Sequence, residues 1–280
     1  MSSADLKQAI NAISEVVINR PPPLRVTDQI YMRLADMYLQ ADHVSRYMDD
    51  KSVIFIGDGD AMALSIVHLK KQRILEKGPK SIHVLDFDER VINSIDRFAE
   101  RKDYTDAISG SLYNVADPIP EELWQKFDVF YTNLPFGSSN EGRSVEIFVR
   151  RGIEATNDEA VGCIVIADYE EVTWTQPILY NTQNILIEKG FYVAEMIPKF
   201  HSYHLEDAPE LTSCSLIVKR FKFRQKPYSS RPITQEERKD FYGKKTPLKW
   251  KCIKDKTNGG KLGTHDCEFI SFEGDICNDL

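Results

Sequence analysis

The sequence contains no apolar run long enough to span a bilayer, and its polar start, residues 1–5, lacks the apolar core of a signal peptide. Its five cysteines form no C-x-x-C pair, and Cys163 and Cys214 fall within segments expected to be buried strands. Internal repeats and low-complexity tracts are also missing. These features predict reduced thiols in a cytoplasmic protein that is not associated with a membrane.

Composition and charge indicate a globular chain with an uneven charge distribution. Of the 280 residues, 42% are hydrophobic and 28% are charged, enough for one large domain with a small appendage. Between Lys219 and Lys256, fourteen Lys and Arg face four Asp and Glu, although the net charge of the chain is −7. The acidic remainder favours a cationic substrate, whereas the basic segment favours an anionic partner.

Hydrophobic periodicity predicts alternating strands and helices after residue 50. Residues 4–18 predict an amphipathic helix, and Thr27 is expected to cap a second helix that ends near residue 48. The expected strands cover residues 52–57, 80–86, 104–109, 127–133, 160–167, 190–198 and 212–221. The expected helices between them cover residues 60–77, 88–101, 141–157 and 174–189.

The last two expected strands have no clear helix between them, so they should pair antiparallel. Seven strands with the last one reversed predict an α/β fold with a doubly wound, Rossmann-like, class I methyltransferase-like sheet. We therefore expect a helical segment over residues 1–50, the sheet domain over 51–221, and a basic C-terminal extension over 222–280. This extension is interpreted as an appendage or tail.

The first expected strand ends in Gly57-Asp58-Gly59-Asp60 and is followed at once by a helical pattern. A strand, a glycine-containing turn and a helix are the unit that holds an adenosyl cofactor in open α/β sheets. The next strand ends in Asp86, which can accept hydrogen bonds from both hydroxyls of a ribose. As an alternative, Asp60 caps a helix and Asp88 is only an acid in a first helical turn.

The fourth expected strand ends in Asn133-Leu134-Pro135-Phe136, one residue away from the Asn-Pro-Pro-Phe/Tyr motif of amino-methylating enzymes. In that chemistry, a polar side chain and a backbone carbonyl orient the target nitrogen while an aromatic ring stacks on the substrate. The alternative is a strand end followed by a proline turn. The carboxyl ends of these strands meet at one edge, so we expect one nucleoside pocket there. The expected cofactor-binding residues are Gly57, Gly59, Asp86, Asp88, Pro135 and Phe136.

An aliphatic amine is protonated at neutral pH and must lose a proton before it attacks a sulfonium. A carboxylate can accept that proton, whereas the amide of Asn133 is no base. We therefore expect Asp60, or else Asp58, to be the proton acceptor.

The segment between the last two strands contains Tyr203, His204, Glu206 and Asp207. Carboxylates and ring faces suit a polyamine, so we expect these residues to bind substrate. A solvated polar turn is the alternative. Cys252, His265, Cys267 and Cys277 are irregularly spaced, and we expect no metal site.

These residues resemble the branched-chain polyamine synthase, or bis(aminopropyl)spermidine synthase, family over roughly residues 20–220. The shared motifs are Arg20-Pro21-Pro22-Pro23 with Asp28-Gln29, the 56–60 loop, residues 85–90, Asn133–Phe136 with residues 146–153, and Tyr203–Pro209. The resemblance implies transfer of an aminopropyl group from decarboxylated S-adenosylmethionine to an amine of spermidine, with release of methylthioadenosine. It matches Asp60 to the acid beside the attacking amine and Asp86 to the ribose-binding acid.

Three departures from the family pattern make this a divergent member. Gly59 replaces the middle acid of the family's Gly-Asp-Asp-Asp loop, and Asn133-Leu134 stands where the family resembles Asp-Pro. The matching segment also begins near residue 20, so we expect no winged-helix domain in this sequence.

Two further hypotheses remain open. The first is a methyltransferase that uses intact S-adenosylmethionine on nucleic acid or another amino group. Aromatic residues interleaved with Lys and Arg in the extension would then contact the nucleic acid: Phe221, Phe223, Tyr228, Phe241, Tyr242 and Trp250. The second is a non-catalytic descendant that binds a partner. A homodimer through the N-terminal helices or the extension is a further expectation.

Overall fold

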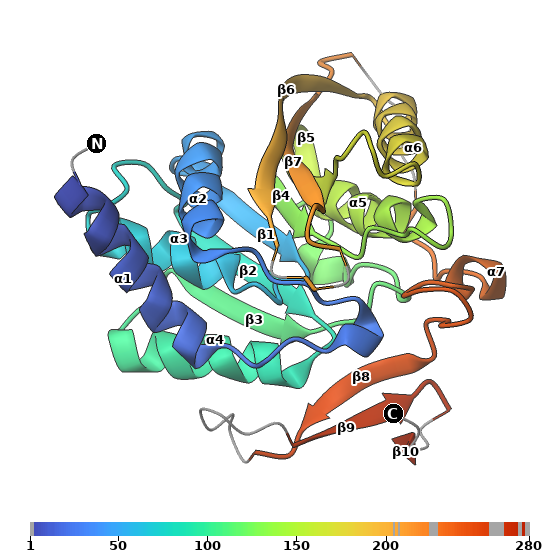
Figure 1. Cartoon of the computed structure of the whole chain (residues 1–280), viewed down its shortest axis with the longest axis horizontal. Helices are drawn as coiled ribbons and strands as arrows, with labels where there is room; N and C mark the ends of the chain where they lie inside the picture. The colour runs from blue at the N-terminus through green and yellow to red at the C-terminus, as the bar shows by residue number, and fades with distance from the viewer. Residues whose placement is uncertain are drawn as a thin grey trace.

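A seven-stranded mixed sheet forms the centre of the computed structural model, which describes residues 3–203, 205–206, 208–223, 229–257, 266–273 and 276–277 (Figure 1). Its strand order is β3-β2-β1-β4-β5-β7-β6. All neighbouring strands from β3 to β5 pair parallel, and β7 pairs antiparallel with both β5 and β6. The class I methyltransferase-like sheet with one reversed strand is therefore confirmed. The strands are β1 (Ser52–Ile56), β2 (Ser81–Asp86), β3 (Ile108–Leu112), β4 (Phe127–Asn133), β5 (Thr156–Ala167), β6 (Phe191–Ser202) and β7 (Thr212–Arg220).

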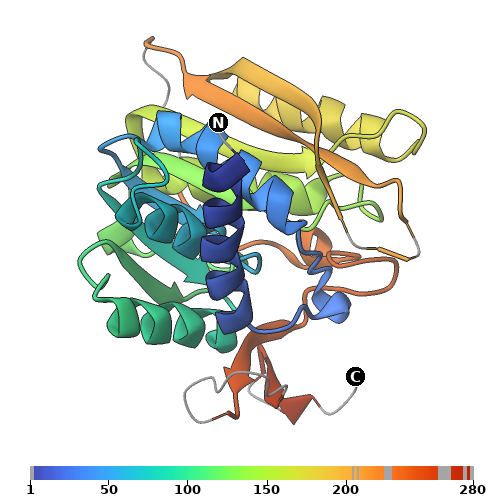
Figure 2. The ribbon, with the colours of Figure 1, turned by 60° about the vertical axis from the view of Figure 1, so that its left-hand side comes forward.

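Helices cover both faces of this sheet. One face carries α2 (Leu34–Met48), α3 (Met62–Lys71) and α4 (Glu89–Lys102), and α1 (Ser3–Asn19) crosses over this layer (Figure 2). The opposite face carries α5 (Arg143–Ala155) and α6 (Thr175–Glu188). Among the residues described, no helix combines the length and apolarity that crossing a membrane would require.

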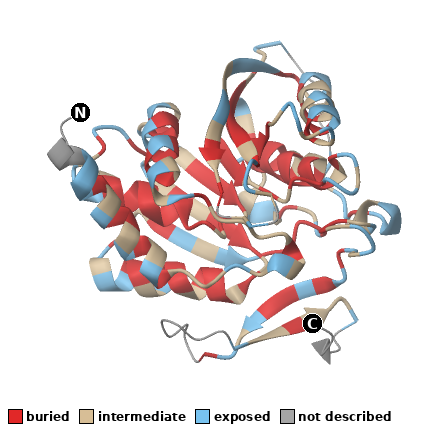
Figure 3. Ribbon diagram, in the orientation of Figure 1, coloured by how far each residue is buried: buried red, intermediate tan, exposed pale blue. Residues whose placement is uncertain are grey.

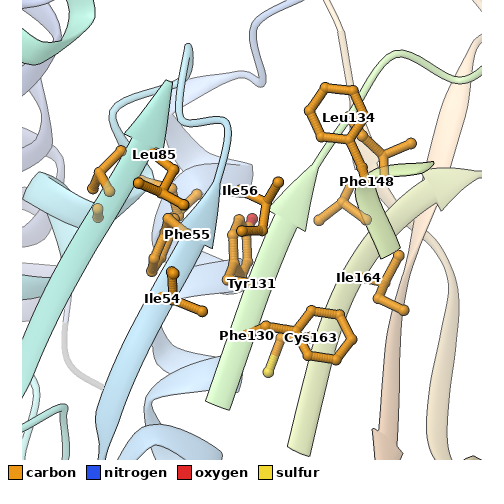
Figure 4. Close-up of a cluster of buried hydrophobic side chains, with 14 of the residues drawn as sticks. Ile54, Phe55, Ile56, Leu85, Phe130, Tyr131, Leu134, Phe148, Cys163 and Ile164 are labelled. Atoms are coloured by element: carbon orange, nitrogen blue, oxygen red, sulfur yellow. The ribbon is translucent and has the colours of Figure 1, made fainter. Parts of the chain in front are cut away.

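The core lies in the central strands, which are covered on both faces (Figure 3). Residues 53–56 are fully buried, because a central parallel strand contacts helices on each side. Phe55 of β1 stacks on Tyr131 of β4, with ring centroids 4.5 Å apart, and Tyr131 is the registered neighbour of Cys163 in β5 (Figure 4). The uninterrupted apolar run that suggested a strand is thus explained by burial on two sides.

Several local boundaries differ from the sequence-based expectation; β5 begins four residues before residue 160 and β6 ends four residues after residue 198, and three other differences have a local cause. The third strand begins at Ile108 rather than at residue 104, because Tyr104 turns inward and its hydroxyl lies 3.0 Å from Nδ1 of His68. The helix after β1 ends at Lys71, because Arg73 adopts a left-handed φ of 59°. Thr27 caps no helix, since its hydroxyl donates to the Leu24 carbonyl within a 3₁₀ turn, η1 (Arg25–Thr27).

The C-terminal extension packs against the sheet domain. It contains α7 (Gln235–Arg238) and an antiparallel sheet of β8 (Trp250–Asp255), β9 (Cys267–Ser271) and β10 (Ile276–Cys277). Strand β8 packs on α4, and Ile253 N–H donates to the carbonyl of Phe87, 2.9 Å away. The interpretation as a tail is therefore wrong for residues 229–257, whose aromatic residues contribute to the core.

Candidate active site

A pocket of about 770 Å³, including its open mouth, lies at the carboxyl ends of β1, β2, β3 and β4. The loops after β1, β2 and β4 line it, as the sequence predicts, and the loop after β3 lines it as well. Two further segments line it: residues 27–31 before α2, and Tyr242 from the C-terminal extension. The pocket is therefore built from three parts of the chain that are distant in sequence.

Two glycines shape the loop after β1. Gly57 has a φ of 76°, a backbone conformation that side chains other than glycine rarely adopt. At Gly59, an added Cβ would lie 3.2 Å from the ring of Tyr31. Tyr31 therefore leaves little room for a side chain at the middle position of this loop.

Asp58 holds the start of the helix that follows β1. Its two carboxylate oxygens accept the N–H groups of Met62 and Ala63, at 2.8 and 3.1 Å, at the start of α3. Burial raises the pKa of this carboxyl, and the two N–H donors lower it. Asp58 lines the pocket while both of its oxygens hold the start of α3, and its role as an alternative proton acceptor remains a prediction.

Asp60 lines the pocket with a carboxylate that caps no helix. One oxygen accepts the Met32 N–H at 3.0 Å, and the other accepts a hydrogen bond from the Asn133 amide. Arg20 Nη1 lies 3.9 Å from this carboxylate and also donates to the Asp60 carbonyl at 2.8 Å. Burial raises the pKa of Asp60, and Arg20 opposes that shift. The alternative in which Asp60 is an N-cap is therefore wrong.

Asp86 stands at the tip of β2, where a ribose is expected. Its oxygens accept the N–H groups of Asp58 and Asp88, each at 2.9 Å, which fixes the orientation of the carboxylate. Burial and the charge of Asp88 raise the pKa of Asp86 to about 7. Each oxygen keeps a lone pair that can accept a ligand hydroxyl.

Asp88 lies outside the pocket lining. It is the N-cap of α4, where its carboxylate accepts the Arg90 N–H at 3.0 Å and pairs with the Arg90 guanidinium at 2.6 Å. The expectation that Asp88 binds the cofactor is corrected, because its oxygens are committed to a buried ion pair.

We expect nucleoside binding to weaken as the pH falls from 8 to 6. A carboxylate accepts hydrogen bonds from both ribose hydroxyls, whereas the protonated acid that forms below the pKa of about 7 accepts them less well. Calorimetric titration with methylthioadenosine should show affinity falling by up to about tenfold per pH unit. Asp86→Asn should bind weakly at every pH. An Asp86→Asn variant whose methylthioadenosine affinity keeps the wild-type dependence on pH would contradict the assignment of Asp86 as the ribose-binding acid.

Asn133, Pro135 and Phe136 all line the pocket after β4. Because the Asp60 carboxylate accepts only, the amide of Asn133 turns its NH₂ group toward it. No hydrogen bond to the side-chain oxygen of Asn133 is found among the described residues, so this oxygen can accept from a substrate amine. Phe136 meets Tyr203 edge to face, with centroids 6.0 Å apart. These contacts place the motif as expected, and its binding role remains a prediction.

The segment expected to bind substrate lies mostly away from the described pocket. Tyr203 is 1% exposed, and its hydroxyl is hydrogen-bonded to that of Ser213 at 2.6 Å. Its ring packs against Phe136 and does not line the pocket. Glu206 is exposed and does not line the pocket. His204 and Asp207 lie outside the described residues. The described pocket therefore does not support the substrate-binding expectation for Tyr203 and Glu206, which stays a prediction.

Sequence reasoning assigned no site role to several residues that line the pocket. Asp28, held at a φ of 58°, places a carboxyl in the pocket whose pKa burial raises to about 6. Tyr113 and Val115 follow β3, and Tyr242 belongs to the extension. The Asp28-Gln29 pair was a motif of the family resemblance, but the composition of the extension indicated nothing about Tyr242.

No group of His, Cys, Asp and Glu that could hold a metal occurs within the described ranges, and His265 lies outside them. Cys163, Cys214, Cys252 and Cys267 are free thiols.

Comparison with known proteins supports one family. The "Branched-chain polyamine synthase A C-terminal domain" family matches residues 8–256. An N(4)-bis(aminopropyl)spermidine synthase of Thermococcus kodakarensis is 27% identical over 207 residues, covering 70% of this chain and 53% of that protein. The chain spans between 38 and 53% of the length of the first curated relatives it matches.

Solved structures share the fold. The branched-chain polyamine synthase of Thermus thermophilus, in complex with N4-aminopropylspermidine and 5'-methylthioadenosine, has a TM-score of 0.67 at 20% identity, covering 81% of this chain and 67% of that one. A putative RNA methyltransferase from Pyrococcus horikoshii has a TM-score of 0.54 at 16% identity, covering 78% of this chain and 98% of that one. With the family match spanning residues 8–256, this chain belongs to the branched-chain polyamine synthase family.

Proposed function

We propose that this chain transfers an aminopropyl group from decarboxylated S-adenosylmethionine to a polyamine amine, with Asp60 as proton acceptor. The observation that carries this proposal is the charge of the pocket. The described lining residues include four carboxyl groups, those of Asp28, Asp58, Asp60 and Asp86, and no Lys, Arg or His. A buried cavity of this charge favours a cation and disfavours a ligand that brings its own carboxylate.

The chain's own residues account for the proton and the orientation of the amine. A protonated amine gives one proton to Asp60, and its lone pair attacks the propyl carbon attached to sulfur. The C–S bond breaks as the C–N bond forms, and its electron pair neutralises the sulfonium, so that methylthioadenosine leaves. The side-chain amide oxygen of Asn133 accepts the second hydrogen of the amine. Positioning supplies most of the rate in such a displacement.

A methyltransferase that uses intact S-adenosylmethionine is the second candidate, because the Asn133 carbonyl is free to accept the hydrogens of a target amine. The expected nucleic-acid surface receives less support. Phe241, Tyr242 and Trp250 are buried and cannot stack on bases, and Tyr228 lies outside the described residues. A homodimer and a cytoplasmic location remain predictions, the latter favoured by the free thiols.

Calorimetry and product analysis distinguish the two transfers. We expect decarboxylated S-adenosylmethionine to bind at least about tenfold more tightly than the intact form, because one misplaced charge in a partly buried site costs more than 1.4 kcal/mol. With spermidine present, mass spectrometry should detect methylthioadenosine and an aminopropylated polyamine. Formation of S-adenosylhomocysteine and a methylated amine instead would replace this proposal with the methyltransferase.

A further inference from the structure

We propose that Arg20 is a positioning residue for the transfer, which holds the Asp60 carboxylate in its charged form so that it can accept the proton of the amine. This inference rests on the proposed function, because it takes Asp60 as the proton acceptor. Arg20 itself lies outside the pocket lining, so it acts on the reaction only through Asp60.

The local sequence fixes the backbone of Arg20 at the end of α1. Its N–H donates to the Val16 carbonyl at 3.2 Å and so continues the last turn of that helix. Residues 21–23 are prolines, which have no N–H to donate to a helix, and the chain therefore leaves α1 at this point. Figure 1 shows the connection that follows, in blue, running from α1 through η1 to α2.

Short contacts hold the Arg20 guanidinium beside the loop after β1. Its Nη1 donates to the main-chain carbonyl of Asp60 at 2.8 Å and lies 3.9 Å from an oxygen of the Asp60 carboxylate. The guanidinium also lies over the ring of Tyr31, 4.0 Å from its centroid, and the Tyr31 hydroxyl donates to the Pro21 carbonyl at 3.1 Å. The side chains of Arg20 and Asp60 are 11% and 3% exposed, so water and salt screen this charge pair only weakly.

The connection between α1 and α2 reaches Asp60 from both of its ends. Arg20 stands at its start, and the N–H of Met32, near its end, donates to a carboxylate oxygen of Asp60 at 3.0 Å. Between these two residues, the side-chain oxygen of Gln29 accepts the N–H of Leu24 at 2.8 Å, which ties the connection to itself. The segment that supplies the positive charge therefore also fixes one oxygen of the acid.

A buried carboxyl at this position needs a nearby positive charge to act as a base. Burial raises the pKa of Asp60, and a protonated Asp60 could not take a proton from the amine. The charge of Arg20 is the largest influence that lowers this pKa, ahead of the hydrogen bonds from the Met32 N–H and the Asn133 amide. Arg20 therefore preserves the basic form of the carboxylate.

Among the described residues, the other titratable groups that interact with Asp60 cannot replace this charge. Asp58, on the same loop, is an acid whose own pKa is raised by burial and by the charge of Asp60. The remaining groups are phenols that stay neutral because burial raises their pKa values: Tyr31, Tyr131 and Tyr203. A cation in the pocket lining would repel positively charged substrates, whereas Arg20 supplies its charge from outside the lining.

Single-turnover rates of methylthioadenosine release, measured with saturating substrates between about pH 5 and 9, test this role. Arg20→Met keeps the length of the side chain and removes its charge, so the pKa of Asp60 should rise and the carboxylate should be lost at a higher pH. The acidic limb of the rate profile should therefore move upward by about 1–2 pH units. The rate should fall by about tenfold or more on that limb and least near pH 9.

Two further variants separate charge from packing. Arg20→Lys keeps the charge, and its acidic limb should lie within about half a pH unit of wild type. Arg46→Met is the matched control, because it removes an exposed arginine that pairs with Asp42 outside the pocket, and it should leave the profile unchanged. An Arg20→Met limb at the wild-type pH would overturn the inference even if the rate fell at every pH, because a packing defect lowers the rate without moving the limb. If thermal unfolding shows that Arg20→Met does not fold, Arg20→Gln takes its place with the same expected shift.

Infrared titration separates this inference from the proposed function. The C=O band of the protonated Asp60 carboxyl, identified by its loss in Asp60→Asn, should appear about 1–2 pH units higher in Arg20→Met than in wild type. Wild-type protein that transfers no aminopropyl group while the variant shows this shift would overturn the proposed function and leave the coupling of Arg20 to Asp60 standing. An unshifted band would overturn the inference even if the transfer occurs.

Discussion

Replacing Asp60 with asparagine should lower the rate of aminopropyl transfer by about 10²–10⁴-fold, the usual contribution of a positioned base. The amide has nearly the shape of the carboxylate and can still accept the Met32 N–H, but it cannot take a proton from the amine. Methylthioadenosine affinity should stay within about threefold of wild type, because Asp60 is not expected to contact the base or the ribose. The measurement is methylthioadenosine release under saturating substrates.

The matched control for this prediction is Asp106→Asn. Asp106 is an exposed acid whose ion-pair partner among the described residues is Lys71, at 3.3 Å, and it lies outside the pocket lining. It should leave turnover unchanged. If Asp60→Asn turned over at the wild-type rate, Asp60 would not be the proton acceptor, and solvent or another group would have to collect the proton.

Replacing Arg151 with methionine should lower the free energy of unfolding by about 3–5 kcal/mol, because it leaves the Glu154 charge buried and unpaired. Both residues are almost fully buried, and Arg151 Nη1 lies 2.8 Å from the Glu154 carboxylate. The same guanidinium donates to the carbonyls of Val115 and Arg231, at 2.9 and 2.8 Å, so it also joins the pocket to the extension. Calorimetric unfolding should show a melting temperature lowered by roughly 10 °C.

Two variants sharpen this test. Arg143→Met removes an exposed ion pair with Glu236 and should cost less than about 1 kcal/mol. The double variant Arg151→Met, Glu154→Leu removes both buried charges and should recover much of the lost stability. A single Arg151→Met variant as stable as wild type would show that the pair is not what holds the extension in place.

The sheet could be predicted from the sequence because its central strands are buried on both faces and therefore read as apolar runs. The same logic fails for β3, an edge strand whose segment Ser109–Leu112 is largely exposed. There, the apolar residue Tyr104, which lies before β3 and points inward, resembles the first residue of a strand in the sequence. The prediction that Thr27 caps a helix was wrong for a related reason. A hydroxyl that can cap a helix can equally donate to a nearby carbonyl in a turn.

The candidate site was predictable in its position but only partly in its residues. The loops after β1, β2 and β4 meet because parallel strands end at one edge of the sheet. The different roles of Asp58 and Asp60 depend on the direction of each side chain in a loop with left-handed backbone at Gly57 and Ala61. That direction has no signature in the pattern of residue types.

The amino-acid sequence alone determined the doubly wound sheet, its reversed strand and the acidic edge where we expect a ligand to bind, because periodicity and strand-end loops are local properties. Only the tertiary structure decided that Asp58 holds the start of α3 while Asp60 caps no helix. It also decided that Asp28 and Tyr242, more than 200 positions apart, line the same cavity. Such long-range placement follows from how buried side chains pack together, and packing is specified by the whole chain rather than by any one segment.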